Sequence, residues 1–270
     1  MGPCVISIEN SHEYGDVVPQ MLRLRYKEFK TRQNYDIPTF KCMEYDTYDT
    51  PATIYVIWRD QGGVVRGCSR MAPTDREYMI KNLWPDMVTS IVLPNHPDIW
   101  ESSRFCIDSE LAAPMRQRIK LEILQAKIEY ALAVGIRGMI GVMPPLIWRA
   151  VFVNSGWPVN HIGPVTELES GEKVVAGWIF VKHAILQNLS KKTNITHSLL
   201  NDNKGIGHLL ARDSILPSPK RFPAPLSVTA INGHSKTEMT QEPFEAFLMK
   251  DEAGSMGTKE GLYQQVMAWI

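Results

Sequence analysis

The sequence is poor in cysteine and contains neither a long apolar run nor an excess of one charge. Its four cysteines lie far apart, with no Cys-x-x-Cys pair and no cysteine–histidine spacing that resembles a zinc site. We therefore expect reduced thiols and no metal. The N-terminus has no basic region followed by an apolar run, and no uncharged apolar run approaches the roughly 20 residues that span a bilayer. These absences predict a cytoplasmic protein without a membrane partner.

A net charge is also absent. Lys and Arg total 29, as do Asp and Glu, so the sequence gives no support to nucleic acid as the main partner. The seven histidines show no ligand spacing, and we find neither a Ser–His–Asp arrangement nor a glycine-rich phosphate loop. With 270 residues, of which 44% are hydrophobic, the chain can form one large or two small domains with a sizeable core.

The first part of the chain predicts one long helix, a loop and a hairpin. Apolar residues recur along one side of residues 14–32, which predicts the helix, and the polar stretch 34–51 predicts the loop. Two β-rich runs, ATIYVIWRD and VVRGCSRM, then flank Gly62-Gly63. A glycine turn between two such runs predicts an antiparallel hairpin.

Helices and strands alternate in the following part. Residues 76–83 predict a short helix, and DIWESSRFCI predicts a strand. A helix is expected from Pro114 to about residue 134, where Gly135 ends it. The strand GMIGVM, a helix from Pro144 that stops before Gly156, and the strand KVVAGWIFV complete the series. This order predicts an α/β (α+β) fold, a mixed sheet flanked by helices.

The composition changes beyond residue 184. Ser, Thr, Asn, Lys and Pro dominate there, and LPSPKRFPAPLS can continue neither a helix nor a central strand. We therefore divide the chain into a main folded domain, 1–183, and a partly ordered extension of unknown role, 184–270. Short helices are expected near 206–212, 243–249 and 260–270.

Acids and arginines gather in two places that are distant in sequence. MEYDTYDT (43–50) holds three carboxylates, and IWESSRF (99–105) holds a Glu and an Arg within a predicted strand. Strand alternation would put Glu101 and Arg104 on opposite faces, and a bulge near Ser102-Ser103 would bring them to one side. Each charged residue alone could be a solvated surface group. Together they predict a shared site, which comprises Arg25, Glu44, Asp46, Asp49, Arg70, Glu101 and Arg104.

The order of these motifs resembles the acyl-homoserine-lactone synthase family, the LuxI-type autoinducer synthases. The resemblance covers roughly residues 15–183 and rests on the charged residues above together with GCSRMAPT (67–74) and NSGWPVNHIGP (154–164). Two positions depart from the family: Tyr35 stands where Trp is usual, and Trp84 where Phe is usual. Both keep a flat apolar surface, so we expect an altered pocket shape rather than lost activity.

The resemblance implies a fold similar to GNAT-type acetyltransferases, with a twisted mixed sheet opened by a V-shaped cleft. It also implies that an acyl group passes from a thioester to the amino group of S-adenosylmethionine, and that lactonisation then expels methylthioadenosine. In this interpretation S-adenosylmethionine is a substrate and no cofactor is needed. Two alternatives stay open: an N-acyltransferase acting on another amine, and a non-catalytic binding module whose charges form structural ion pairs.

Roles follow from the demands of that chemistry. The amine must lose a proton, so Glu101 is the first candidate base and Asp46 the second. Arg104 is expected to hold the substrate carboxylate, and Asp46 and Asp49 to pair with Arg25 and Arg70. Backbone N–H groups of residues 102–105 would bind the thioester oxygen. The expected catalytic set is Glu101, Asp46 and Arg70. The aromatic residues expected in the substrate site, against the adenine or the bound chain, are Phe29, Tyr35, Trp84 and Phe105, with ordinary core packing as the alternative.

The acyl chain is expected against the strand GMIGVM and the helix after it. Val142 lacks the hydroxyl that a family member would use for a 3-oxo group, which favours an unsubstituted chain. The apolar residues expected to line this pocket are Met139, Val142, Met143, Leu146, Trp148 and Phe152.

The acyl donor is expected to be acyl carrier protein, with acyl-CoA as the alternative. The segment IDSELAAPMRQRIK has no glycine with which to cradle a CoA pyrophosphate. An acidic carrier would need a basic surface, for which the candidates on one helix are Arg116, Arg118, Lys120 and Lys127.

Overall fold

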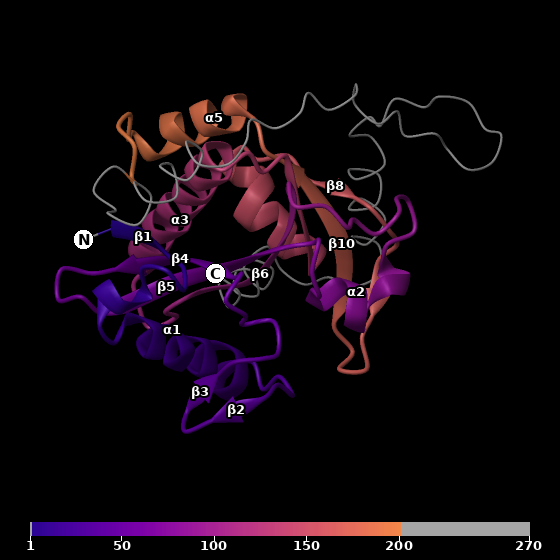
Figure 1. The fold of residues 1–270 in the computed structure, drawn as a ribbon, viewed down its shortest axis with the longest axis horizontal. Coiled ribbons are helices and arrows are strands. Elements are labelled where there is room, and N and C mark those ends of the chain that lie inside the picture. Colours follow the sequence, from indigo (N-terminus) through magenta and orange to yellow (C-terminus); the bar gives the residue numbers. More distant parts are fainter. Residues whose placement is uncertain (1, 201–270) are drawn as a thin grey trace, which may run out of the picture.

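The computed structural model describes residues 2–200, and they form a mixed sheet of eight strands with helices on both faces (Figure 1). Only β6 and β7 run parallel, while every other pairing in this sheet is antiparallel. The strands along the sheet are β1 (Gly2–Ile6), β4 (Ile54–Arg59), β5 (Val65–Pro73), β6 (Ile99–Ile107), β7 (Gly138–Met143), β10 (Lys173–Phe180) and β8 (Asn160–His161), with β9 (Thr166–Glu167) paired to β10.

The predicted hairpin is confirmed, and a strand that was not predicted extends it. β4 and β5 pair around the turn, where Gly63 has φ of 80°, a conformation that glycine adopts without strain. The additional strand, β1, pairs with β4 along all five of its residues. The stretch 34–51 is not entirely a loop, because β2 (Thr39–Phe40) and β3 (Met43–Glu44) form a small separate sheet.

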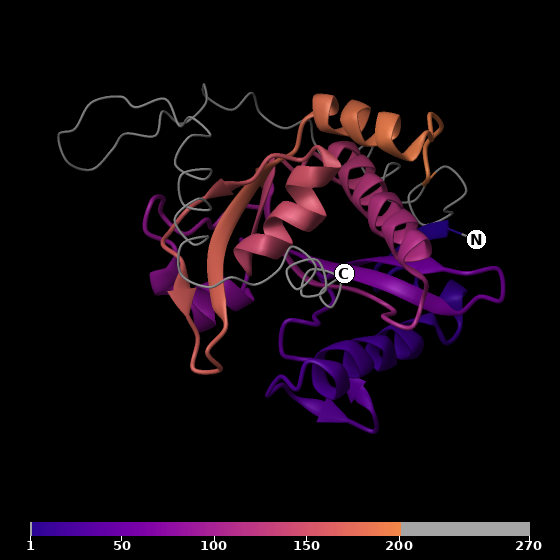
Figure 2. The ribbon, with the colours of Figure 1, turned by 180° about the vertical axis from the view of Figure 1, so that it is seen from behind.

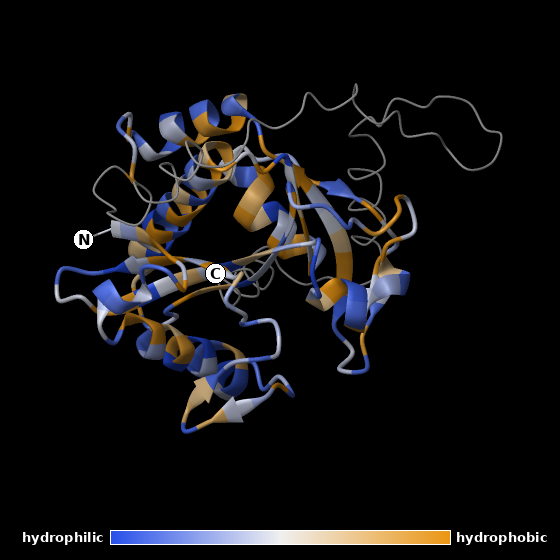
Figure 3. Cartoon of the chain, viewed as in Figure 1, coloured by the Kyte–Doolittle hydropathy of each residue, from blue (hydrophilic) through white to orange (hydrophobic). Residues whose placement is uncertain are grey.

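One face of the sheet packs against the larger hydrophobic core. It is covered by α3 (Ala113–Ala133), by α4 (Pro145–Ile147) with its continuations η4 (Trp148–Phe152) and η5 (Val153–Ser155), and by α5 (His183–Thr193). Figure 2 shows these helices side by side from behind, and Figure 3 shows apolar residues on the helix formed by α4 and η4. The helices predicted from Pro114 and Pro144 are confirmed, although the second is divided into a short α-helix, a π-helical stretch and a 3₁₀ turn.

The opposite face carries η1 (Ser11–Tyr14), α1 (Val17–Arg25), η2 (Tyr26–Arg32), α2 (Met79–Leu83) and η3 (Pro85–Met87). The single helix predicted over 14–32 is wrong in one respect. Residues 17–25 are α-helical, and residues 26–32 widen into a π-helix. Periodicity cannot distinguish the two, because both bury one side of the segment. Inside the π-helix, Glu28 is fully buried and accepts hydrogen bonds from the backbone N–H and hydroxyl of Ser109.

The pairing of β6 with β7 ends early and positions the site. Three residue pairs are in register, the last being Glu101 with Ile140, after which the two strands part. We call this point, with Ser102 on β6 and Gly141 on β7, the fork. The resemblance implied a mixed sheet opened by a V-shaped cleft, and the fork is a point at which two neighbouring strands of this sheet separate.

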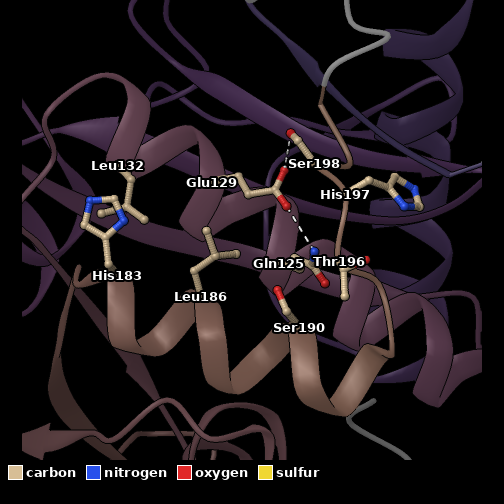
Figure 4. Close-up of a pocket in the computed structure, with 9 residues that line it drawn as sticks. All are labelled: Gln125, Glu129, Leu132, His183, Leu186, Ser190, Thr196, His197 and Ser198. Carbon is tan, nitrogen blue, oxygen red and sulfur yellow. Dashed lines mark hydrogen bonds between the residues drawn. The ribbon is translucent and has the colours of Figure 1, made fainter.

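The described chain continues past the predicted boundary at residue 184. α5 begins at His183 and packs against α3, with Leu189 fully buried. In Figure 4 a shallow groove lies between the two helices, and Ser198 donates a hydrogen bond to Glu129 beside it. This groove shares no residue with the charged groups described below. The helices expected near 206–212, 243–249 and 260–270 lie outside the described residues.

No helix within residues 2–200 combines the length and the apolar character needed to cross a membrane.

Candidate active site

Arg25 is the deepest member of a cluster of charges. It ends α1, is fully buried, and lies against the segment that follows β3. Its Nε donates to Glu44 Oε2 at 2.5 Å, and its two terminal nitrogens donate to both carboxylate oxygens of Asp49 at 2.8 and 2.9 Å. This planar two-point contact uses the geometry that only an arginine offers.

Arg70 extends the cluster from the neighbouring strand β5. Its Nη1 contacts Asp46 Oδ1 at 2.5 Å and Asp49 Oδ1 at 3.2 Å, and its Nε donates to the hydroxyl of Ser103 at 3.0 Å. Its Nη2 is buried and has no hydrogen-bond partner among the described residues. A buried N–H without an acceptor is costly, so this atom marks a position where an incoming oxygen would be stabilised.

Arg104 completes the cluster through a β-bulge. Between β5 and β6 the register moves from Cys68–Cys106 to Arg70–Ser103, so Ser69 alone faces both Arg104 and Phe105. Arg104 adopts φ of 52°, which is unusual for a residue other than glycine. Its guanidinium contacts Asp46 at 2.6 Å and Glu44 at 3.1 Å.

These six side chains form what we call the charged network: Arg25, Arg70, Arg104, Glu44, Asp46 and Asp49. Three guanidiniums balance three carboxylates, and the side chain of Arg104, at 15% exposure, is the most accessible of them. Burial alone would raise the pKa of Asp49, but hydrogen bonds and charge from Arg25, with the charge of Arg70, hold that pKa well below its ordinary range. The network therefore holds equal numbers of acidic and basic side chains, and its arginines stabilise the ionised form of Asp49.

Glu101 lies beside the charged network but has different partners. The backbone N–H of Ile80 donates to its Oε1 at 2.7 Å, and that of Met79 donates to its Oε2 at 3.2 Å. Burial raises the pKa of this carboxyl, against the opposing effect of the two N–H groups and of the nearby arginines. Arg104 contacts the sulfur of the same Met79, so Glu101 and Arg104 share one side of β6.

The other face of β5 and β6 carries a single buried amine. Lys127 of α3 is fully buried, and its Nζ donates to the hydroxyls of Ser69, at 3.0 Å, and of Ser102. The amine also lies 5.9 Å from the centre of the Phe152 ring. Burial lowers the pKa of Lys127 from 10.5 to about 7.

The family model of the autoinducer synthases matches residues 9–189, which is more than half of the chain. This range contains the whole charged network, the fork and Glu101. The chain belongs to the autoinducer synthase family. The GNAT-like mixed sheet that the sequence predicted is thereby confirmed.

Individual autoinducer synthases resemble the chain over most of their length. The acyl-homoserine-lactone synthase of Ralstonia solanacearum is 32% identical over 160 residues, which cover 57% of this chain and 78% of that protein. The structure of the CoA-dependent acyl-homoserine lactone synthase BjaI with MTA aligns with a TM-score of 0.67 and 25% identity, over 73% of this chain and 91% of its own. The structure of TofI in a ternary complex with an inhibitor and MTA aligns with a TM-score of 0.59 and 27% identity. The alignment covers 70% of this chain and 97% of TofI.

The ion pairs of the charged network confirm that acids and arginines distant in sequence converge on one site. Asp46 and Asp49 pair with Arg70, and Asp49 also pairs with Arg25, as expected for this synthase. The bulge predicted near Ser102-Ser103 is confirmed, because the register shifts between Ser103 and Cys106. Sequence alternation locates a bulge only to within a few residues, because a flip at any of them restores the same pattern.

The predicted aromatic set divides between different parts of the fold. Phe29 and Tyr35 stack at 6.3 Å, and the guanidinium of Arg104 lies 5.9 Å from the Phe29 ring, so these two border the charged network. Trp84 packs instead against the core around α2. The placement of Phe105 beside the network is wrong, because the bulge turns it towards α3 and the larger core.

The predicted acyl-pocket set is also divided. Met139, Trp148 and Phe152 are fully buried in the α3-side core, and Met143 packs against the same core. Leu146 is half-buried within α4. Val142 belongs to the opposite face, with Trp84, because it alternates with Met143 along β7.

The predicted basic surface on α3 is half wrong. Lys120 and Lys127 are buried, and Lys120 donates to the carbonyl of Ala150 at 2.9 Å. Arg118 is exposed and pairs with Glu122 at 2.6 Å, and Arg116 is half-buried. The apolar stripe of α3, with Ile119 and Ile123 at four-residue spacing before Lys127, contained the signal that places this lysine inside.

The polar residues around these groups were not predicted from the sequence. Ser69, Ser102 and Ser103 bond to Lys127 or Arg70, and Glu172 accepts a hydrogen bond from the hydroxyl of Tyr35 at 3.0 Å. Glu172 is 137 residues from Tyr35, so no local pattern could have paired them.

Proposed function

We propose that this chain is an acyl-homoserine-lactone synthase that makes a quorum-sensing signal in the cytoplasm. The amine of S-adenosylmethionine attacks the carbonyl of an acyl thioester, forming a C–N bond while the C–S bond breaks and the thiol leaves with a proton. The carboxylate of the product then attacks the carbon next to the sulfonium. That second C–S bond breaks, the lactone closes, and neutral methylthioadenosine leaves.

The observation that carries this proposal is the charged network beside the fork, in which three arginines lie against three carboxylates. S-adenosylmethionine brings a carboxylate and a sulfonium, and a fixed array of both signs can receive both without reorganising. Arg104 is the most accessible cation for the carboxylate. The unpartnered Nη2 of Arg70 offers a second donor to the same ligand.

Glu101 is the proposed base for the attacking amine. A free α-amino group has a pKa near 8, so a carboxylate whose pKa is raised by burial is better matched to it than an ordinary one. Asp46 is the second candidate, but both of its oxygens are already held by Arg70 and Arg104. Backbone N–H groups of residues 102–105 would take the thioester oxygen at the bulge.

In this proposal S-adenosylmethionine is a substrate, and the reaction uses no metal or cofactor. The donor is the acyl thioester of either acyl carrier protein or CoA. The glycine-free start of α3 favours the carrier protein, whereas BjaI, which shares this fold, is a CoA-dependent synthase. Both donors therefore belong in the test.

The test is to incubate the purified full chain with S-adenosylmethionine and each donor. We expect equimolar methylthioadenosine and acyl-homoserine lactone, measured by chromatography and mass spectrometry. Acyl transfer to another amine without methylthioadenosine would instead identify a general N-acyltransferase. No turnover with any donor, in a protein that folds, would support the binding module and overturn the proposal.

Glu101→Gln should lower kcat about 10²–10⁴-fold, while S-adenosylmethionine still binds by calorimetry. The matched control is Glu110→Gln, because Glu110 is exposed on the surface, and it should leave kcat unchanged. In the wild type, kcat/KM should fall on the acid side when Glu101 becomes protonated, because the base must be ionised. This fall should occur at a higher pH than for an ordinary carboxyl, since burial raises the pKa of Glu101. Unchanged turnover in Glu101→Gln would remove Glu101 from the mechanism.

A further inference from the structure

Lys127 is a buried cationic group without an anionic partner. None of the ion pairs among residues 2–200 includes it, and its hydrogen bonds go only to the hydroxyls of Ser69 and Ser102. In its protonated form the amine has three N–H donors, so two hydroxyl acceptors leave one donor without a partner among residues 2–200. Burying a charge in this state is unfavourable, which is why the pKa of Lys127 falls to about 7.

The amine of Lys127 lies close to the fork, because it is hydrogen-bonded to Ser102. Ser102 is the first β6 residue beyond the last β6–β7 pair, and its carbonyl lies so close to Gly141 that a Cβ there would meet it at 2.9 Å. Ser102 also lies just before the bulge, where the thioester oxygen is proposed to bind. The amine is therefore one hydroxyl away from the proposed reacting carbonyl.

Residues expected to line the acyl chain lie on the same side. Phe152, whose ring centre lies 5.9 Å from the Nζ atom, belongs to the α3-side core together with Met139, Met143 and Trp148. An acyl chain that leaves the charged face through the fork and enters this core would pass Lys127 within its first few carbons. A plain methylene chain would then lie against an amine whose third donor stays unsatisfied.

We propose that Lys127, held by Ser69 and Ser102, binds an oxygen substituent near the thioester end of the acyl chain, so that the enzyme prefers 3-oxo- or 3-hydroxyacyl donors over unsubstituted ones. This inference rests on the proposed function. An oxygen in that position accepts the third N–H and completes the coordination of the amine. The absence of a hydroxyl at Val142, which favoured an unsubstituted chain, is outweighed because Val142 lies on the opposite face and Lys127 supplies a donor on this one.

The test compares donors that differ only in this oxygen. Hexanoyl, 3-oxohexanoyl and 3-hydroxyhexanoyl thioesters, and the same three forms of octanoyl and decanoyl, are given to the purified full chain with S-adenosylmethionine. For at least one chain length, kcat/KM for an oxygen-bearing donor should exceed that for the plain donor by about tenfold, the effect of one hydrogen bond to a buried amine. The 3-oxo and 3-hydroxy arms show which oxygen is accepted.

Lys127→Met keeps the length of the side chain and removes the donor, so the preference should disappear while turnover of the plain donor is kept or increased. Lys127→Gln retains an N–H donor and should keep part of the preference, and it serves as the second variant if Lys127→Met does not fold. The matched control is Lys120→Met, which removes the other buried lysine of α3, bonded to Ala150 rather than near the fork. It should leave the preference intact.

Two results would overturn the inference alone: a wild-type enzyme that prefers plain donors at every length, or a preference that Lys127→Met leaves unchanged. Absence of methylthioadenosine with all donors would instead overturn the proposed function, and this inference with it.

Discussion

The two faces of β5 and β6 solve the problem of buried polarity in different ways. On the α1 side, three guanidiniums lie against three carboxylates, and each of these side chains has an ion-pair partner among residues 2–200. One N–H group of Arg70 is left without an acceptor there. On the α3 side, Ser69 and Ser102 hold one amine that no carboxylate of residues 2–200 approaches. Residues adjacent in sequence, such as Ser69 and Arg70, thus belong to opposite environments.

The contrast indicates where a ligand has to supply what the protein lacks. A balanced network is rigid and can receive a ligand that is itself both positive and negative. A lone buried amine has a lowered pKa and still lacks an acceptor, so it discriminates between ligands that bring an oxygen and those that do not.

The largest effect should come from breaking the balanced face. Arg25→Met leaves Glu44 and Asp49 buried without their main partner, and we expect unfolding free energy to fall by about 3–5 kcal/mol. Urea unfolding followed by circular dichroism measures this. Arg66→Met is the matched control, because Arg66 also pairs with two carboxylates but is 30% exposed, and it should cost less than about 1 kcal/mol. Similar losses in both variants would contradict the distinction.

A smaller effect should appear on the face with the lone amine, as a dependence on pH. The pKa of Lys127 is lower in the folded state, about 7, than the 10.5 of an exposed lysine. Between these values the unfolded chain binds more protons than the folded chain, so the unfolding free energy rises with pH. The destabilisation caused by burying the ammonium is at its full size only below about pH 7. Between about pH 7 and pH 9, the unfolding free energy of the wild type should rise by on the order of 2 kcal/mol relative to that of Lys127→Met.

The control for this pH effect is Lys120→Met. Burial lowers the pKa of Lys120 less, to about 8, so its contribution should begin at higher pH. A difference between wild type and Lys127→Met that is constant from neutral to alkaline pH would show that Lys127 is ionised normally.

The smallest effect concerns the border of the charged face. Tyr35→Phe removes the hydrogen bond to Glu172 but keeps the stack on Phe29, so we expect a loss of about 1 kcal/mol in unfolding free energy. The exposed Tyr45 provides the control, since Tyr45→Phe should change it by no more than a few tenths. If both variants are equally stable, the Tyr35–Glu172 contact does not stabilise the fold.

Much of the fold could be predicted because its signals are local. The glycines at 62 and 63 specify a hairpin, Pro114 and Gly135 delimit α3, and GMIGVM is β7 to the residue. β1 and α5 were missed because each is short or lies in a polar stretch and is stabilised by a distant partner, β4 for one and α3 for the other.

The site divides along the same line. The charged network was predicted because the resemblance ordered its members, although their contacts span up to 60 residues. Lys127 was misplaced on the surface because a lysine is usually exposed, and only its spacing from Ile123 contradicts that. Phe105 and Val142 were misplaced because face assignments depend on a bulge and on a strand register that the sequence alone does not fix.

The extra residue at Arg104 also sets the phase of everything after it in β6. Before it, Glu101 and Ser103 point to the α1 side; after it, Cys106 points there again and Ile107 enters the larger core, an alternation that holds only because Ser103 and Arg104 share one side. A regular strand of the same length, without the bulge, would exchange the two sides beyond Ser103 and turn the guanidinium of Arg104 towards the apolar core under α3. The bulge therefore decides which core each of the last residues of β6 joins, and these residues depend on it as much as the charged network does.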